Sequence, residues 1–313
     1  MIPLMLRTGV LFLLVGWFAL GQPVSGEPPA ASTLGISPSD RPVTDTAPRE
    51  TLDLSDHTVV FSVDDGYHSV FTNMYPLLKK HGMTMSLGVI CDYVRSGKPS
   101  YNPSAGFMKK SEIQELIDSL DIEIASHSLS HPFLTRLDSS EAWKEIHNSK
   151  AILESLFDVD VATFVYPYGD MNARVRSMVK KAGYKMGRAV RPGTPNFWVD
   201  PYRLPIIELR METKLEDMKR SIANRNTTIV LAHQVVEKPK VFTEWNLADF
   251  TALVEWMAAT RVRVTTLDAL YHEWWYKRMG LFMEEVAAAY PDSRKKLLFQ
   301  DVDIDATQAF QPR

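Results

Sequence analysis

The regular alternation of two hydrophobicity patterns after Thr58 constrains the fold of this chain more than any other feature. Short apolar and β-branched runs are typical of buried strands, and longer stretches with apolar residues three or four positions apart are typical of helices. About seven or eight such strand–helix units follow one another over roughly 220 residues, which predicts an α/β fold, namely a distorted parallel (β/α)7–8 barrel in a single domain. A doubly wound open sheet is the alternative.

The predicted strands end in a small set of polar residues. The strands are expected at residues 59–63, 84–90, 122–126, 161–166, 185–190, 203–209, 227–232 and 261–267, and the helices at 70–81, 109–120, 139–157, 172–183, 214–224 and 247–260. Barrels of this kind carry their functional residues at the carboxyl ends of the strands. The first candidates are therefore the polar residues just after these strands, which are Asp64, Asp65, His127, Tyr168 and His233.

The segments on either side of this region predict an exported protein. Residues 1–26 carry one cation and an unbroken apolar stretch, a pattern typical of a secretory signal peptide. A membrane anchor is the alternative, but a spanning helix needs about 20 apolar residues and this stretch is shorter. The proline-rich residues 27–50 predict a disordered linker, residues 51–270 the folded domain, and residues 271–313 a C-terminal helix and tail. The chain is therefore expected to be secreted, periplasmic or in the cell envelope, with no stable membrane span after signal cleavage.

Composition narrows the class of partner. The formal net charge is -3 and the pI is about 6.3, so the chain lacks the basic excess of nucleic-acid-binding proteins. No nucleic-acid partner is expected, and a neutral glycan fits better. The single cysteine, Cys91, cannot form an internal disulfide, so stability must come from core packing. Because Cys91 follows an apolar run, we expect a buried small hydrophobe rather than a reactive thiol.

The run VVFSVDDG ends a predicted strand with two adjacent carboxylates and a glycine. Neighbouring side chains of a regular strand point to opposite faces, but Gly66 permits a sharp turn that brings both carboxylates to one pocket. Two close carboxylates repel each other unless a cation or a proton lies between them, so the pair Asp64 and Asp65 indicates a metal ligand beside a general base. A solvated turn after a strand is the alternative interpretation.

The run SHSLSH places two imidazoles four residues apart after another predicted strand. If Ser128 begins a helical turn, His127 and His131 lie on the same side and can bind one ion. Two imidazoles and one carboxylate leave coordination positions open, as in catalytic rather than structural metal sites. A coincidental or structural pair of histidines is the alternative.

Two further strand ends carry candidate groups. In FVYPYGD, Pro167 fixes the backbone and Gly169 allows close approach, so the backbone N–H of Tyr168 could face the pocket as an oxyanion donor. In LAHQ, His233 follows the strand at residues 227–232. A simple turn and a core or surface histidine are the respective alternatives.

Over most of residues 57–270 these motifs, in this order, resemble the polysaccharide deacetylase family, carbohydrate esterase family 4. The resemblance implies a catalytic domain of the polysaccharide deacetylase barrel type at residues 51–270. It also implies that Asp65, His127 and His131 hold one divalent metal ion and that Asp64 is the base.

The same resemblance assigns the remaining roles. It implies that Tyr168 supplies the oxyanion N–H and a groove wall, and that His233, in the Leu-x-His motif with Leu231, is the acid. The extended run DDGYHSVF, with Tyr67 and Ser69, is similar to members that act on poly-N-acetylglucosamine.

The chain departs from the family pattern in its orienting arginine. Family members often have an arginine shortly before the Pro-Tyr motif, whereas Thr163, Phe164 and Val165 stand at residues 163–165 here. The substitute is expected to be Arg188, Arg191 or Arg203. Ser62-Val63 replaces the usual Thr-Phe before the two aspartates. Trp198 is expected to supply the aromatic of the fourth motif, and Asp200 to be a partner of His233.

The resemblance implies a metal-dependent hydrolase that removes N-acetyl groups from an N-acetylglucosamine-containing polysaccharide. Zn is the expected metal, with Co, Ni or Fe as alternatives. An O-acetyl polysaccharide esterase, a small-molecule amidase and a non-catalytic glycan-binding module are the alternative functions. The oligomeric state stays open.

Four aromatic residues cluster near the C-terminus, namely Tyr271, Trp274, Trp275 and Tyr276. They are expected to pack a terminal helix on the barrel, and a sugar-stacking platform is the alternative.

Overall fold

The computed structural model describes residues 52–96 and 106–289, with the side chains of 286–289 left out. The expected signal peptide and linker lie outside the described residues, as does the tail after residue 289. Within the described ranges, no helix combines the length and apolar character needed to cross a membrane.

Seven parallel strands form a closed barrel, as the sequence predicts. They are β1 (Thr58–Val63), β2 (Ser86–Val89), β3 (Glu123–Ser126), β4 (Thr163–Val165), β5 (Met186–Pro192), β6 (Leu204–Glu208) and β7 (Thr227–Ala232). Each pairs with the next, and β7 returns to pair with β1 from Thr58↔Thr227 to Val63↔Ala232. This closure rules out the doubly wound open sheet. An eighth parallel strand, β10 (Arg263–Thr265), pairs with the first half of β1.

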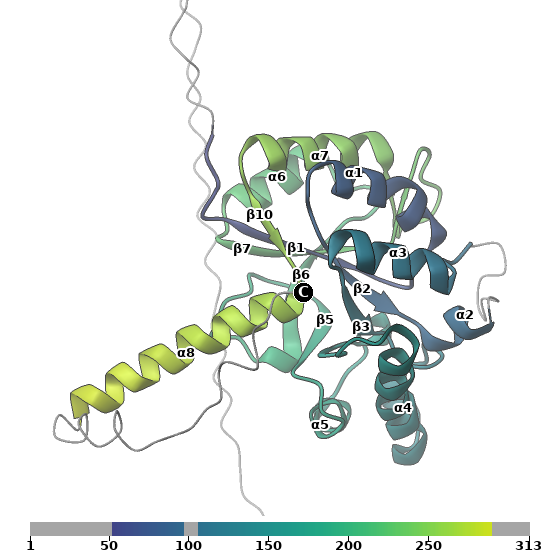
Figure 1. Ribbon diagram of the computed structural model, residues 1–313, viewed down its shortest axis with the longest axis vertical. Coiled ribbons are helices and arrows are strands. Elements are labelled where there is room, and N and C mark those ends of the chain that lie inside the picture. The colour runs from purple at the N-terminus through teal and green to yellow at the C-terminus, as the bar shows by residue number, and fades with distance from the viewer. Residues whose placement is uncertain (1–51, 97–105, 290–313) are drawn as a thin grey trace, which may run out of the picture. The chain divides into compact units, whose positions relative to one another are not determined.

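Helices surround the barrel (Figure 1). They are α1 (Tyr75–Lys80), which continues the π-helical turn η1 (Val70–Met74), α2 (Cys91–Ser96), α3 (Lys110–Leu120), α4 (Ser139–Phe157), α5 (Ala173–Lys181), α6 (Leu215–Ala223), α7 (Leu247–Ala259) and α8 (Leu267–Ala289). The predicted helices match to within two residues, because side-chain caps mark their starts. Asp138, Asn172 and Asn246 accept hydrogen bonds from the first backbone N–H groups of α4, α5 and α7. Among the α-helices of the described residues, only the short α2 was not predicted.

The alternation of side chains along each strand separates an outer core from the barrel interior. On β1, Val59, Phe61 and Val63 belong to the large core that the surrounding helices cover, whereas Val60 belongs to a second cluster. That second cluster combines residues of β5, β6 and β7 with Leu267 and Trp274 of α8. The first turns of α8 therefore close the amino-terminal end of the barrel.

A buried carboxylate ties this end together. Glu123, the first residue of β3, accepts hydrogen bonds from the hydroxyl of Ser86 at 2.6 Å, from the hydroxyl of Thr163, and from the backbone N–H of Asp268 at 3.0 Å. Burial raises the pKa of Glu123 although these donors oppose the shift. The first turn of α8 is thus fixed to the first residues of β2, β3 and β4.

Cys91 is fully buried, as expected. Burial raises the pKa of its thiol to about 12, which keeps it protonated and unreactive.

We predict that Glu123→Ala lowers the free energy of unfolding by about 3 kcal/mol, because buried donors at Ser86, Thr163 and Asp268 lose their acceptor. Urea unfolding followed by circular dichroism measures the change. Glu216→Ala is the control, since Glu216 is an exposed helix residue whose loss should cost under about 0.5 kcal/mol. Equal stability of the two variants would show that Glu123 does not hold the amino-terminal end together.

Candidate active site

A pocket of about 360 Å³ opens at the carboxyl ends of the strands. Asp64 and Asp65 follow β1 directly, His127 follows β3, and His233 follows β7. The closure of the barrel joins two of these positions, because the backbone N–H of Asp64 donates to the carbonyl of Ala232 at 2.9 Å. All five first candidates from the sequence, together with His131, line this one pocket.

The turn after β1 brings both carboxylates into the pocket. Asp65 has φ 70° and Gly66 has φ 77°, so the strand alternation ends at Asp65, as the glycine suggests. The left-handed conformation is unfavourable for a residue with a Cβ and costs about 1 kcal/mol or more. Asp tolerates this region better than most residues, and here the turn aims its carboxylate into the pocket that it lines.

The two histidines come together in a bent loop. The helical turn expected at Ser128 is wrong, because Ser128 (φ 66°) and His131 (φ 65°) are left-handed. Ser128 Oγ instead accepts a hydrogen bond from the N–H of His131 at 2.9 Å. His127 Nδ1 lies 2.8 Å from the carbonyl of Val165, which leaves its Nε2 toward the pocket. The two Nε2 atoms lie 3.1 Å apart.

The spacing of three atoms fits one metal ion. Asp65 Oδ1 lies 3.4 Å from Nε2 of His127 and 3.6 Å from Nε2 of His131. Ligand atoms that bind one tetrahedral ion at about 2.0–2.2 Å lie about 3.3 Å from each other, close to the observed spacing. Asp65 Oδ1 is also buried without a well-formed hydrogen bond. The donor set and this unsatisfied oxygen fit a divalent cation.

The charges around these atoms favour a cation. Burial alone would raise the pKa of Asp65, but the neighbouring histidines outweigh it and hold that pKa below its usual range. Burial opposes a charge on His127, yet Asp64 and Asp65 raise its pKa. Burial and the neighbouring His127 lower the pKa of His131 to about 3, so its imidazole is neutral and able to act as a ligand at neutral pH.

Arg188 of β5 is the arginine that orients Asp64. Its guanidinium is fully buried and contacts both carboxylate oxygens of Asp64, while its Nε donates to Ser62 Oγ at 3.2 Å. The other two candidates, Arg191 and Arg203, are exposed. The guanidinium that orients Asp64 therefore comes from β5, the strand beside β4. Ser62, which stands in the altered motif before the two aspartates, accepts a hydrogen bond from this guanidinium.

Tyr168 forms one wall of the pocket. The backbone of Tyr168, with φ 58°, turns the chain after β4. The next position requires glycine, because a Cβ on Gly169 would lie 2.6 Å from Cβ of Val190. The ring of Tyr168 is half exposed, stacks on Phe133 with centroids 4.0 Å apart, and meets the edge of His131 at 4.4 Å. The ring of Tyr168 therefore contacts the loop that carries His131 on one side and the ring of Phe133 on the other.

His233 lines the pocket, but its expected partner lies elsewhere. Asp200 pairs with Arg176 at 2.5 Å and accepts from the N–H of Tyr202, so the expectation that it partners His233 is wrong. Trp198 is 69% exposed and stacks on Phe197, and it does not line the pocket. His233 Nδ1 is buried without a hydrogen-bond partner among the described residues.

Glu145 was not predicted from the sequence. This residue of α4 accepts from the backbone N–H groups of Leu129 and Ser130 at 2.9 and 3.0 Å and from the Ser130 hydroxyl at 2.7 Å. It holds the loop that carries His131, yet nothing in a helical pattern distinguishes it from a solvated glutamate.

Five more residues that line the pocket were not predicted, namely Val190, Glu208, Arg210, Phe242 and Thr243. Glu208 ends β6, binds Arg210 at 2.7 Å, and Arg210 lies over the ring of Phe242. Glu208 could have been found, since it is polar and stands at the end of a predicted strand.

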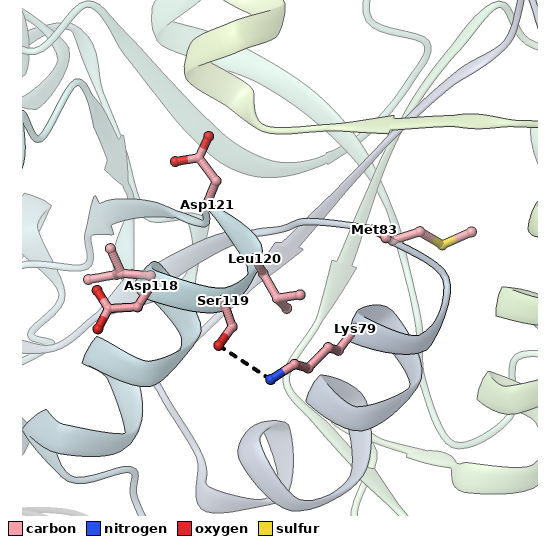
Figure 2. A pocket seen from close by; sticks show the side chains of 8 residues that line it. Lys79, Met83, Asp118, Ser119, Leu120 and Asp121 are labelled. Atoms are coloured by element: carbon pink, nitrogen blue, oxygen red, sulfur yellow. Dashed lines mark hydrogen bonds between the residues drawn. The ribbon is translucent and has the colours of Figure 1, made fainter. Parts of the chain in front are cut away.

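A second hollow at the opposite end of the barrel lacks this chemistry. It lies between the ends of α1 and α3, where the Lys79 ammonium reaches the Ser119 hydroxyl at 3.5 Å (Figure 2). Its carboxylates, Asp118 and Asp121, are both exposed. The pocket around His127 is thus the better candidate for catalysis.

We predict that Glu145→Ala weakens Zn²⁺ binding about 10- to 100-fold, because the loop of His131 loses three hydrogen bonds that fix it. Competition with a chromophoric chelator measures the affinity. Glu141→Ala, an exposed position one turn earlier in α4, should bind Zn²⁺ as the unaltered chain does. Unchanged affinity in Glu145→Ala would show that the loop holds its shape without this carboxylate.

Comparison with known proteins identifies the domain. Residues 51–187 match the family model of polysaccharide deacetylases. The putative polysaccharide deacetylase YxkH of Bacillus subtilis (strain 168) is 28% identical over 139 residues, 44% of this chain and 47% of YxkH. A poly-beta-1,6-N-acetyl-D-glucosamine N-deacetylase of Staphylococcus aureus (strain MRSA252) is 26% identical over 155 residues, 45% of this chain and 52% of that protein.

The matched part spans about half the length of these two curated relatives. The solved structure of the peptidoglycan deacetylase PdaC from Bacillus subtilis superposes with a TM-score of 0.51 over 76% of this chain and 100% of that chain, at 20% identity, and so shares the fold. Residues 51–187 are therefore similar to the polysaccharide deacetylase family, and the structure shares the fold of PdaC.

Proposed function

We propose that this protein is a metal-dependent hydrolase that removes N-acetyl groups from an N-acetylglucosamine-containing polysaccharide and releases acetate. One observation carries the proposal. A carboxylate held by a buried arginine, Asp64, lies beside three side chains whose ligand atoms are spaced for one ion. A metal site that served only stability would not need this second carboxylate, whose Oδ2 lies 3.8 Å from His127 Nε2.

Asp65, His127 and His131 are the residues that would hold the metal, with Zn²⁺ expected and Co, Ni or Fe as alternatives. A divalent cation bound there supplies Lewis acidity, which polarises an acetyl carbonyl and lowers the pKa of water. Asp64 accepts the proton of the water that attacks the acetyl carbon. Arg188 keeps the carboxylate oriented for this transfer through its two contacts.

Tyr168 and His233 complete the proposed mechanism. The backbone N–H of Tyr168 donates to the oxygen that becomes negative as water adds, where one such donor is worth about 3 kcal/mol. His233 lies in the same pocket and donates a proton to the nitrogen as the C–N bond breaks. Water thus supplies the hydroxyl of acetate, and the sugar leaves as a free amine.

The substrate class rests on the site and on the names of relatives. A poly-N-acetylglucosamine deacetylase and a peptidoglycan deacetylase are among the proteins similar to this chain. Both names describe polymers of amino sugars. Export by residues 1–26 and a catalytic domain at residues 51–270 would place the enzyme where such polymers lie, outside the cytoplasm.

We expect the purified, Zn²⁺-loaded chain to release acetate from β-1,4- or β-1,6-linked N-acetylglucosamine oligomers. Asp64→Asn should bind the metal but lose at least about 10³-fold in kcat, because no base remains. His127→Ala should lose both metal and activity. His147→Ala, an exposed histidine outside the pocket, is the matched control and should be fully active. Acetate and bound metal are quantified for each protein.

The outcome separates the alternatives. No acetate from either polymer, with stoichiometric metal, would rule out aminoglycan deacetylation. Release from acetylated xylan instead would identify an O-acetyl esterase, and glycan binding without turnover a binding module.

Arg188→Lys should lower kcat about 100-fold with little change in KM, because lysine keeps the charge but cannot contact both oxygens of Asp64. Metal affinity should be retained while kcat falls without a matching rise in KM, a split that a purely structural arginine would not produce. Arg191→Lys, exposed on the same strand, is the control. An unchanged kcat in Arg188→Lys would contradict a positioning role.

A further inference from the structure

The second half of α8 extends beyond the part that packs on the barrel. In Figure 1 it is the yellow helix that leaves the body of the domain. Leu267, Leu270 and Trp274 are buried, whereas residues 275–285 are exposed, apart from the half-buried Arg278. The expectation that the aromatic cluster packs on the barrel therefore holds for Trp274 and not for Trp275 or Tyr276, which are 47% and 65% exposed.

This exposed part of α8 carries an apolar stripe with the spacing of a helix–helix contact. Trp275, Met279 and Phe282 are separated by four and then three residues and are 47%, 41% and 57% exposed. Side chains at such intervals lie along one side of a helix, as the a and d positions of paired helices do. With Trp275 and Phe282 at d and Met279 at a, the stripe is a seam that could face a second helix.

The charges beside the stripe are self-complementary. In this heptad, Arg278 and Glu285 both occupy g, the position whose charges set partner and orientation in paired helices. Arg278 donates to the carbonyls of Phe197 and Val199 of its own chain, which are uncharged and leave its positive charge in place. Glu285 forms no ion pair among the described residues. The e positions, Tyr276 and Met283, are uncharged.

The orientation follows from these positions. In a parallel pair g faces e of the other helix, so no charges would meet. In an antiparallel pair g faces g, so Arg278 would meet Glu285 of the partner subunit, and two-fold symmetry would repeat the contact. The same arrangement places Met279 opposite Phe282 of the partner subunit.

We propose that the exposed half of α8 is an interaction surface for a second copy of this chain, which binds it as an antiparallel helix pair. The self-complementary charges select a second copy over an unrelated partner, because each helix carries both members of the pair. The buried Leu267 and Trp274 anchor the helix to the barrel, so the seam is presented by a fixed element.

Sedimentation equilibrium of the full-length chain at several concentrations tests the proposal. The unaltered chain should form dimers, and Phe282→Glu should abolish them. Arg278→Glu and Glu285→Arg should each weaken dimerisation about tenfold, since like charges then face each other twice. Lys277→Glu changes the net charge by the same amount as Arg278→Glu but lies at f, away from the seam, and should leave the dimer intact.

Mixing the two charge variants decides the orientation. Arg278→Glu and Glu285→Arg chains together should form mixed dimers at least as well as the unaltered chain, because both g–g contacts become attractive. A monomer at every concentration would overturn the proposal, and so would dimers that neither charge variant weakens. Monomeric chain that binds phosphatidylglycerol vesicles through Phe282 would show that a membrane surface covers the stripe instead.

Discussion

The pairing of β7 with β1 is the interaction on which the remaining structure depends. It closes the sheet, so that side chains at every second position point inward and stack in layers from one end of the barrel to the other. On β1 the layers are Val60, Ser62 and Asp64, and on β7 they end in His233. Without closure the polar residues at the upper ends of these strands would lie along an edge rather than around one pocket.

The layers explain how a buried charge can be tolerated. Arg188 lies in the middle layer, level with Ser62, and reaches up to Asp64 in the next. Burying either charge alone is costly, so each one makes the other necessary. The ion pair of Arg188 and Asp64 lies next to the atoms of the candidate metal site. Asp64 therefore binds the arginine, and the carboxylate of Asp65 stays available to a cation.

Much of the fold could be predicted because its signals are local. Hydrophobic periodicity and capping residues such as Asp138 mark elements to within two residues, and strand ends indicate most of the pocket. The partner of Asp64 could not be chosen, since Arg188 lies 124 residues away and only closure brings it near. The loop of His131 was misjudged because a left-handed Ser128 leaves no trace in a four-residue spacing. Asp200 was wrongly expected to partner His233, because its place beside a motif does not reveal that Arg176 binds it instead.

The residues of α8 that close the amino-terminal end of the barrel also limit how a ligand can approach the pocket. Leu267, Leu270 and Trp274 fill that end together with the strands, and Glu123 fixes the helix that carries them. The barrel therefore has a single mouth, and a long chain cannot thread through it. A ligand that reaches Asp64 must therefore enter at the carboxyl ends of the strands, where Tyr168 and Phe242 line the pocket. The rim is open there, since Tyr168 and Phe242 are 52% and 58% exposed, so a ligand longer than the pocket is not enclosed by these two side chains.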